Sequence, residues 1–163
     1  MPALAHLSAG GETYEVRRAV RADVAAIVEL IAADQIGGGR DGGALAPYER
    51  AFAAIDSDPA QLLVVVTDAS REVVGTLQMT YIPGLARRGG LRAQIEAVRV
   101  GEHLRGRGLG HALCAWAIDE ARRRGCGLVQ LTSDKRRTPA HRFYGRLGFT
   151  ASHEGFKLRL TDA

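Results

Sequence analysis

The stretch VRVGEHLRGRGLGHAL, residues 98–113, leaves an apolar run, passes through arginines and alternating glycines, and enters a helical pattern. Gly106, Gly108 and Gly110 bring no side chain to pack at the point where the helix begins. The first turn of a helix leaves backbone N–H groups unpaired, and the helix dipole favours an anion beside them. Because glycine has no Cβ atom, phosphate oxygens can approach those N–H groups closely. The stretch therefore predicts a phosphate-binding turn between a strand and a helix.

Two common phosphate motifs do not fit this turn. A P-loop ends in Gly-Lys-Ser/Thr, which the stretch lacks, and a dinucleotide fingerprint needs glycine where His111 stands. The spacing that fits is Arg105-x-x-Gly108-x-Gly110, directly after a strand. It resembles the pyrophosphate-binding signature of the GNAT (GCN-related N-acetyltransferase) superfamily.

A second motif lies downstream in AHRFYGRLGF, residues 140–149. It resembles the A-x-x-F-Y-x-x-x-G-F motif of the same superfamily, and one helix and one strand fit between the two motifs. With both motifs in order, and an opening similar to the usual first strand and helix, the chain is identified as a GNAT member over about residues 14–160. One position departs from the family pattern, because Arg137 stands where many members carry asparagine. The matching residues are Ala140, Phe143, Tyr144, Gly148 and Phe149.

The hydrophobic pattern predicts a mixed α+β chain with the elements in a definite order. Residues 1–11 are expected to form a flexible leader, and residues 12–163 a single domain. Strands are expected within 13–20, 61–83 (two strands with a turn at 68–71), 91–100, 127–133 and 149–160, and helices within 21–34, 46–59, 108–124 and 138–148. The resemblance implies a twisted, mixed, mostly antiparallel sheet of six to seven strands, flanked by about four helices, with splayed fourth and fifth strands.

The composition of the chain argues against several classes of function, namely membrane, nucleic-acid and metal binding. The 163 residues are 46% hydrophobic and 25% charged, with a net charge of +4, which is ordinary for one globular domain. No apolar run is long enough to span a membrane, and we expect a cytoplasmic protein that binds neither membrane nor nucleic acid, since no aromatic residues interleave with the dispersed arginines. Cys114 and Cys126 have no metal-ligand spacing, so no metal site is expected.

The resemblance implies acetyl-CoA as co-substrate, with its pantetheine along the fourth strand and its pyrophosphate in the glycine turn. The Val98 N–H is the expected donor to the thioester oxygen, and Ser133 or a basic side chain is expected to replace the missing asparagine. The cofactor-binding residues expected on this basis are Val98, Arg99, Val100, Arg105, Gly106, Arg107, Gly108, Leu109, Gly110, His111, Ser133, Arg137, His141 and Tyr144.

Two residues are candidates for the proton transfers. Tyr144 matches the motif tyrosine, and a phenol that is protonated at neutral pH can return a proton to a departing thiolate; the alternative is that Tyr144 only packs beside Phe143. Glu96 lies within a strand, an unusual place for a charge unless it faces a cleft or a partner. Strict alternation puts Glu96 on the same face as Val98 and Val100. A general base and a structural ion pair are both open roles for Glu96.

The predicted activity is acetyl transfer from acetyl-CoA to a primary amine by direct attack in a ternary complex. The C-terminal part is similar to aminoalkylphosphonate and other small-amine N-acetyltransferases, which favours a small-molecule acceptor. The acceptor site is expected between the first helices and the chain end. Arg40 and Arg50 are either partners for an anionic acceptor there or solvated surface residues, and both roles are open. A catalytically silent acetyl-CoA-binding regulatory module and a protein or peptide N-acetyltransferase remain alternatives, and so does a homodimer.

Overall fold

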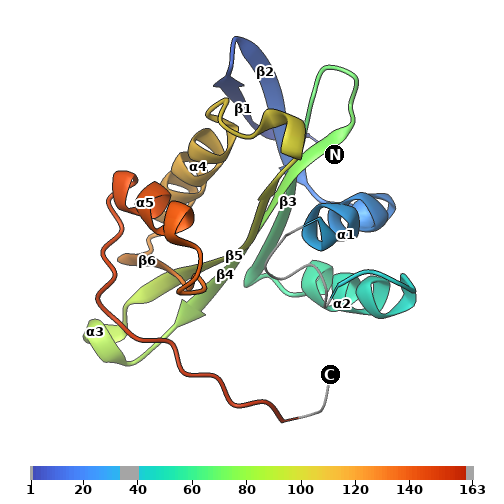
Figure 1. Cartoon of the computed structure of the whole chain (residues 1–163). Helices are drawn as coiled ribbons and strands as arrows, with labels where there is room; N and C mark the ends of the chain where they lie inside the picture. Colours follow the sequence, from blue (N-terminus) through green and yellow to red (C-terminus); the bar gives the residue numbers. More distant parts are fainter. Residues whose placement is uncertain (1, 34–40, 161–163) are drawn as a thin grey trace.

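The computed structural model describes residues 2–33 and 41–160. Within these ranges six strands form one sheet in the order β1-β2-β3-β4-β5-β6 (Figure 1). Neighbouring strands from β1 to β5 are antiparallel, and β6 joins β5 in parallel. The predicted mixed, mostly antiparallel sheet is thus confirmed. The strands are β1 (Ala3–Ala9), β2 (Glu12–Arg18), β3 (Gln61–Thr67), β4 (Val73–Pro83), β5 (Leu91–Val100) and β6 (Leu128–Leu131).

Helices cover both faces of the sheet (Figure 1). One face carries α1 and α2, which pack Ile27, Val28 and Phe52 against Val65 of β3. The other carries α4, whose Leu109 and Leu113 lie in the main core. No helix in the described part of the chain is long and apolar enough to cross a membrane. The helices are α1 (Val24–Ala32), α2 (Ala46–Ser57), α3 (Ala86–Gly89), α4 (Leu109–Arg123) and α5 (Thr138–Arg146), with short 3-10 turns η1 (Arg21–Asp23) and η3 (Glu102–Leu104).

The expectation of a flexible leader over residues 1–11 is wrong. Residues Ala3–Ala9 form β1, which pairs with β2 through a turn at Gly10 and Gly11. Leu7 and Ala9 are buried in the main core, so this strand is held by the burial of its apolar side chains. Both turn glycines have positive φ, +57° and +83°, as a two-residue type I′ hairpin requires.

The expectation of closing strands over residues 149–160 is also wrong. This segment follows α5 without regular secondary structure, and each of residues 151–160 is exposed. Its alternation of apolar and basic residues suits a strand, but a strand forms only where a neighbouring strand offers a hydrogen-bonding edge. None of the described residues pairs with it.

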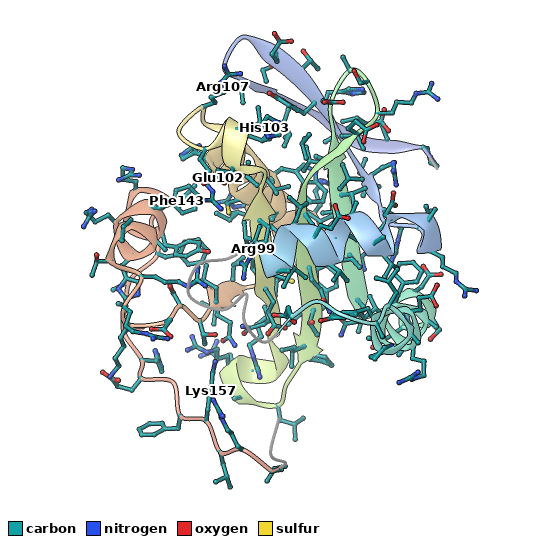
Figure 2. All side chains as sticks on the ribbon, turned by 45° about the vertical axis from the view of Figure 1, so that its right-hand side comes forward. Arg99, Glu102, His103, Arg107, Phe143 and Lys157 are labelled. Carbon is teal, nitrogen blue, oxygen red and sulfur yellow. The ribbon has the colours of Figure 1, made fainter. Side chains whose placement is uncertain are left out.

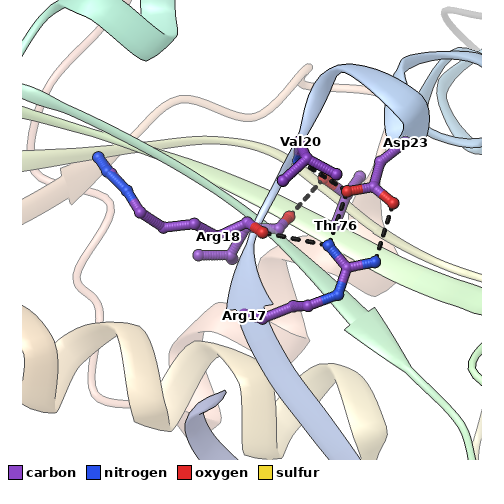
Figure 3. Close-up of polar contacts among 6 residues, drawn as sticks. Arg17, Arg18, Val20, Asp23 and Thr76 are labelled. Atoms are coloured by element: carbon purple, nitrogen blue, oxygen red, sulfur yellow. Dashed lines mark hydrogen bonds and ion pairs between the residues drawn. The ribbon is translucent and has the colours of Figure 1, made fainter. Parts of the chain in front are cut away.

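A buried ion pair fixes the start of α1 to the sheet (Figure 3). The Asp23 carboxylate accepts hydrogen bonds from both terminal nitrogens of Arg17, at 2.7 and 2.9 Å. It also accepts one from the Val20 N–H at 2.7 Å. The bidentate geometry fixes direction as well as distance, so β2 determines where α1 crosses the sheet.

Candidate active site

The strand β5 carries a bulge in its second half. Thr76 of β4 pairs with Arg99 and Gln78 pairs with Glu96, so Ala97 and Val98 together face a single residue of β4. Ala97 has a φ of +52°, a left-handed conformation that alanine adopts only under constraint. A bulge releases backbone groups from the ladder. Backbone donors are therefore available at the position where the resemblance places the thioester oxygen.

Just before the bulge, β5 also loses its neighbour on the other side. The pairing of β5 with β6 ends at Ile95 and Leu131, although β5 continues to Val100. The fourth and fifth strands predicted from the sequence, within residues 91–100 and 127–133, are β5 and β6 of the structure. The predicted splay between them corresponds to this divergence. Among the described residues, nothing pairs with the outer edge of β5 from Glu96 onward. An extended ligand could pair there as an added strand.

The bulge also corrects the predicted faces of β5. Ile95 is buried in the core beneath α4, and Val98 and Val100 pack against that same core. Glu96 follows Ile95, so it faces the opposite side, which α1 and α2 cover. Strict alternation predicts Glu96, Val98 and Val100 on one face, and this is wrong because the extra residue shifts the pleat by one position. Glu96 is exposed.

The glycine turn presents open backbone. Gly106 and Gly108 have φ of +78° and +89°, and a Cβ atom on either would meet nothing within 4 Å. Leu109, fully buried, begins α4 directly after them. The first N–H groups of α4 therefore point toward an uncovered turn. The assignment of this turn to the pyrophosphate stays a prediction, and the other residues predicted there are Arg105, Arg107, Gly110 and His111.

The β1–β2 hairpin lies against the glycine turn near Arg107 (Figure 2). A Cβ atom on Gly10 would lie 3.2 Å from the Cβ atom of Arg107. Arg105 forms an exposed ion pair with Glu102 at 3.7 Å. The contact with the hairpin thus positions the turn, whereas the backbone at Gly106 and Gly108 stays open.

Tyr144 lies half-buried on α5 between two aromatic rings. Its ring makes edge-to-face contacts with Phe143 at 5.1 Å and with Phe149 at 5.9 Å between centroids. Burial raises the pKa of Tyr144, the nearby Cys114 adds to that rise, and the positive charges of Arg99 and Arg137 oppose it. The fold therefore brings Arg99 of β5 and Tyr144 of α5 close enough to interact electrostatically.

The residues expected at the adenosine end lie around the loop that joins β6 to α5. The Ser133 hydroxyl is buried without a hydrogen-bond partner among the described residues. Arg137 is half-buried just before α5, and its N–H donates to Asp134 O at 2.9 Å. His141 donates from Nε2 to the same carbonyl, also at 2.9 Å. His141 thus closes the loop that joins β6 to α5, and its contact with the cofactor stays a prediction.

Two further features bear on the site. Among residues 2–33 and 41–160, no group of three metal-ligating side chains is clustered. A hollow of about 620 Å³, lined by His6, Glu15 and Arg17 among others, lies between the β1–β2 hairpin and the β3–β4 turn. It shares no residue with the glycine turn or with β5.

Of the two arginines considered for the acceptor, Arg40 falls outside the described residues, and Arg50 is exposed on α2.

The sequence alone does not identify several contacts of the site. The approach of Gly10 to Arg107 and the proximity of Cys114 to Tyr144 join residues far apart in the chain. Phe143 lies under the turn, where a Cβ atom on Gly110 would be 3.9 Å from its ring. The Gly-Gly pair between two alternating segments is a hairpin signal that could have revealed β1.

The family follows from comparison with known proteins. The model of the acetyltransferase (GNAT) family matches residues 26–149, and the chain belongs to this family.

Two curated proteins and one solved structure are similar to this chain. The chain is 41% identical over 67 residues to an aminoalkylphosphonate N-acetyltransferase of Salmonella typhimurium, across 41% of this chain and 44% of that protein. It is 35% identical over 88 residues to a glucosamine 6-phosphate N-acetyltransferase of Trypanosoma brucei brucei, across 54% of this chain and 58% of that protein. The chain thus spans about half the length of these curated relatives. A solved structure described as a transcriptional regulator from Bacillus halodurans is 42% identical, with a TM-score of 0.86 over 90% of this chain and 99% of that one.

Proposed function

We propose that the protein acetylates the primary amine of a small molecule by direct attack within a ternary complex. The observation that carries the proposal is the continuity of two open backbone surfaces. None of the described residues pairs with the outer edge of β5 from Glu96 onward, and this edge leads through residues 101–105 to the uncovered Gly106 and Gly108. An extended chain with a pyrophosphate at one end fits that path.

Acetyl-CoA supplies the activated acetyl group as a thioester. In the proposed mechanism the Val98 N–H donates a hydrogen bond to the thioester oxygen and stabilises the charge that develops there. Glu96, on the face covered by α1 and α2, accepts the amine proton through a water molecule. Tyr144 donates a proton to the sulfur that leaves, and its raised pKa keeps the phenol protonated at neutral pH.

The proposed acceptor carries a phosphorus oxyanion besides its amine. Both curated relatives are named for such substrates, an aminoalkylphosphonate and glucosamine 6-phosphate. Arg99 supports the assignment, since the bulge turns it to the same face of the sheet as Glu96, the face that α1 and α2 cover. A guanidinium binds such an oxyanion through parallel hydrogen bonds.

Thiol release from acetyl-CoA tests the reaction and the acceptor together. The panel pairs aminomethylphosphonate with methylamine and glucosamine 6-phosphate with glucosamine, and adds spermidine and a lysine peptide. We expect kcat/KM to be at least about tenfold higher for the phosphorus-bearing member of a pair. That preference should shrink in Arg99→Gln and persist in Arg122→Gln, an exposed arginine on α4.

Other outcomes would reject the proposal. Turnover of the lysine peptide alone would indicate a protein acetyltransferase. Binding of acetyl-CoA without turnover of any amine would favour the silent regulatory module. No acetyl-CoA binding would contradict the assignment of Gly106 and Gly108 to the pyrophosphate.

A further inference from the structure

The face of the sheet that α1 and α2 cover is apolar over β3 and polar beyond it. On β3, Leu63 and Val65 pack into the apolar cluster beneath these helices. Residues paired directly on neighbouring strands point to the same face, so the pairing of the strands identifies the rest of that face. Its polar side chains are Gln61, Gln78, Thr80, Gln94, Glu96 and Gln130.

Four of these polar side chains form one row across the sheet. Gln61 of β3 pairs with Thr80 of β4, Thr80 with Gln94 of β5, and Gln94 with Gln130 of β6. At the β3 end, the Gln61 Oε1 atom accepts hydrogen bonds from the Thr80 hydroxyl at 2.9 Å and from Gln78 Nε2 at 3.0 Å. Both lone pairs of this carbonyl are thus used within the sheet.

The β6 end of the row keeps unused hydrogen-bonding groups. Gln130 Nε2 donates to Gln94 Oε1 at 2.7 Å, the one hydrogen bond that these two side chains make among the described residues. The pair therefore retains an amide NH₂ group on Gln94 and an amide carbonyl on Gln130. Exchanging the O and N atoms of both amides would only exchange which glutamine donates. Both residues are half-buried, so a ligand can reach them.

This amide pair lies beside Glu96. Gln94 and Glu96 are two residues apart on β5 and share a face, so their Cα atoms are about 7 Å apart. Gln130 is on the next strand, about 5 Å from Gln94. The three positions are close enough for one small molecule to contact all of them.

We propose that Gln94 and Gln130 bind hydroxyl groups of the acceptor, so that the preferred substrate is an amino sugar phosphate. The proposal rests on the proposed function, since it takes acetyl transfer beside Glu96 as given. A hydroxyl group both donates and accepts, so neighbouring hydroxyls on one ring match an amide NH₂ group next to an amide carbonyl. A plain alkyl chain would exclude water from both amides without replacing its hydrogen bonds, which costs affinity.

Two acceptors that carry the same charges test the proposal through thiol release from acetyl-CoA. Glucosamine 6-phosphate has hydroxyl groups, and aminohexyl phosphate has none. We expect kcat/KM to be at least about tenfold higher for the sugar, as two neutral hydrogen bonds would give.

The double variant Gln94→Leu/Gln130→Leu removes both amides together, so neither is left without its partner. We expect the preference for the sugar to fall to within about threefold in this variant. The control is Thr13→Val, an exposed polar residue of β2 outside the row, which should retain the preference. Circular dichroism establishes that each variant is folded.

Binding of glucose 6-phosphate provides a readout that needs no turnover, because this sugar lacks the amine. Calorimetric titration in the presence of CoA should give a Kd about tenfold higher in the double variant than in the wild type. Equal preferences in the wild type and the double variant would overturn the proposal and leave the acetyl transfer standing. Glucose 6-phosphate binding that depends on the two glutamines, with no amine turned over, would support the hydroxyl contacts and reject the reaction. Neither binding nor turnover would reject both.

Discussion

At the scale of single residues, the Tyr144 hydroxyl is the atom whose removal tests the proposed proton donor. Tyr144→Phe keeps the ring between Phe143 and Phe149. We expect kcat to fall about 100-fold, the usual contribution of one positioned general acid, with little change in the KM for acetyl-CoA. Because burial raises the pKa of Tyr144, wild-type kcat should lose this group's contribution only above about pH 10. Steady-state kinetics between about pH 6 and pH 11 measure both effects.

Tyr81→Phe provides a control for the loss of a hydroxyl group. The Tyr81 hydroxyl donates a hydrogen bond to the Met79 sulfur at 3.7 Å, and Tyr81 lies in the main core and not in the glycine turn. Its removal should leave kcat unchanged. Equal kcat in Tyr144→Phe and wild type would assign the proton to another donor.

The glycines of the turn and the aromatic motif could be predicted at this scale because their function depends on residue type at fixed local spacing. The orientation of Glu96 could not. It depends on a bulge at Ala97, and an alanine at a φ of +52° carries no signal in the sequence. The bulge arises from the register between β4 and β5, which is a long-range property.

At the scale of elements, the β1–β2 hairpin should influence acetyl-CoA binding through Gly10. A methyl group at this position would meet Arg107 at 3.2 Å, whereas one on Gly11 would meet nothing within 4 Å. Both glycines have positive φ, so alanine at either should lower the free energy of unfolding by about 1 kcal/mol. Only Gly10→Ala should raise the Kd for acetyl-CoA, by about tenfold, because it displaces the pyrophosphate turn. Calorimetric titration of both variants measures the difference, and an equal Kd in the two would show that the hairpin does not position the turn.

The elements differ in how far the sequence predicts them. The helix α4 and the strands β3, β4 and β5 follow from their own periodicity and burial. Residues 155–160 have an equally clear alternation, yet form no strand, because a strand forms only when it pairs with a neighbour and none of the described strands pairs with this segment. Periodicity therefore predicts which segments can be strands, and the available edges decide which of them pair.

At the scale of the whole molecule, stability should decline in acid through Asp23, which joins the α1 layer to the sheet (Figure 3). Burial acts to raise the pKa of Asp23, and the hydrogen bonds from Arg17 and Val20 outweigh it, so the pKa is lowered from 3.8. A group with a lowered folded-state pKa contributes stability above its unfolded-state pKa and loses it as the pH falls through the folded-state value. The free energy of unfolding should therefore fall below about pH 4.

Asp23→Asn isolates this contribution to stability. At neutral pH we expect a loss of about 3 kcal/mol, because Arg17 is left without its buried counter-charge, and the decline below about pH 4 should become shallower. The control is Asp119→Asn on α4, where the pair with Arg122 at 2.6 Å is largely exposed and contributes about 0–0.5 kcal/mol. Urea unfolding at neutral pH and at about pH 3 measures each loss. An acid decline as steep in Asp23→Asn as in the wild type would place the titrating group elsewhere, and equal losses in the two variants would mean that the Arg17–Asp23 pair does not hold α1 on the sheet.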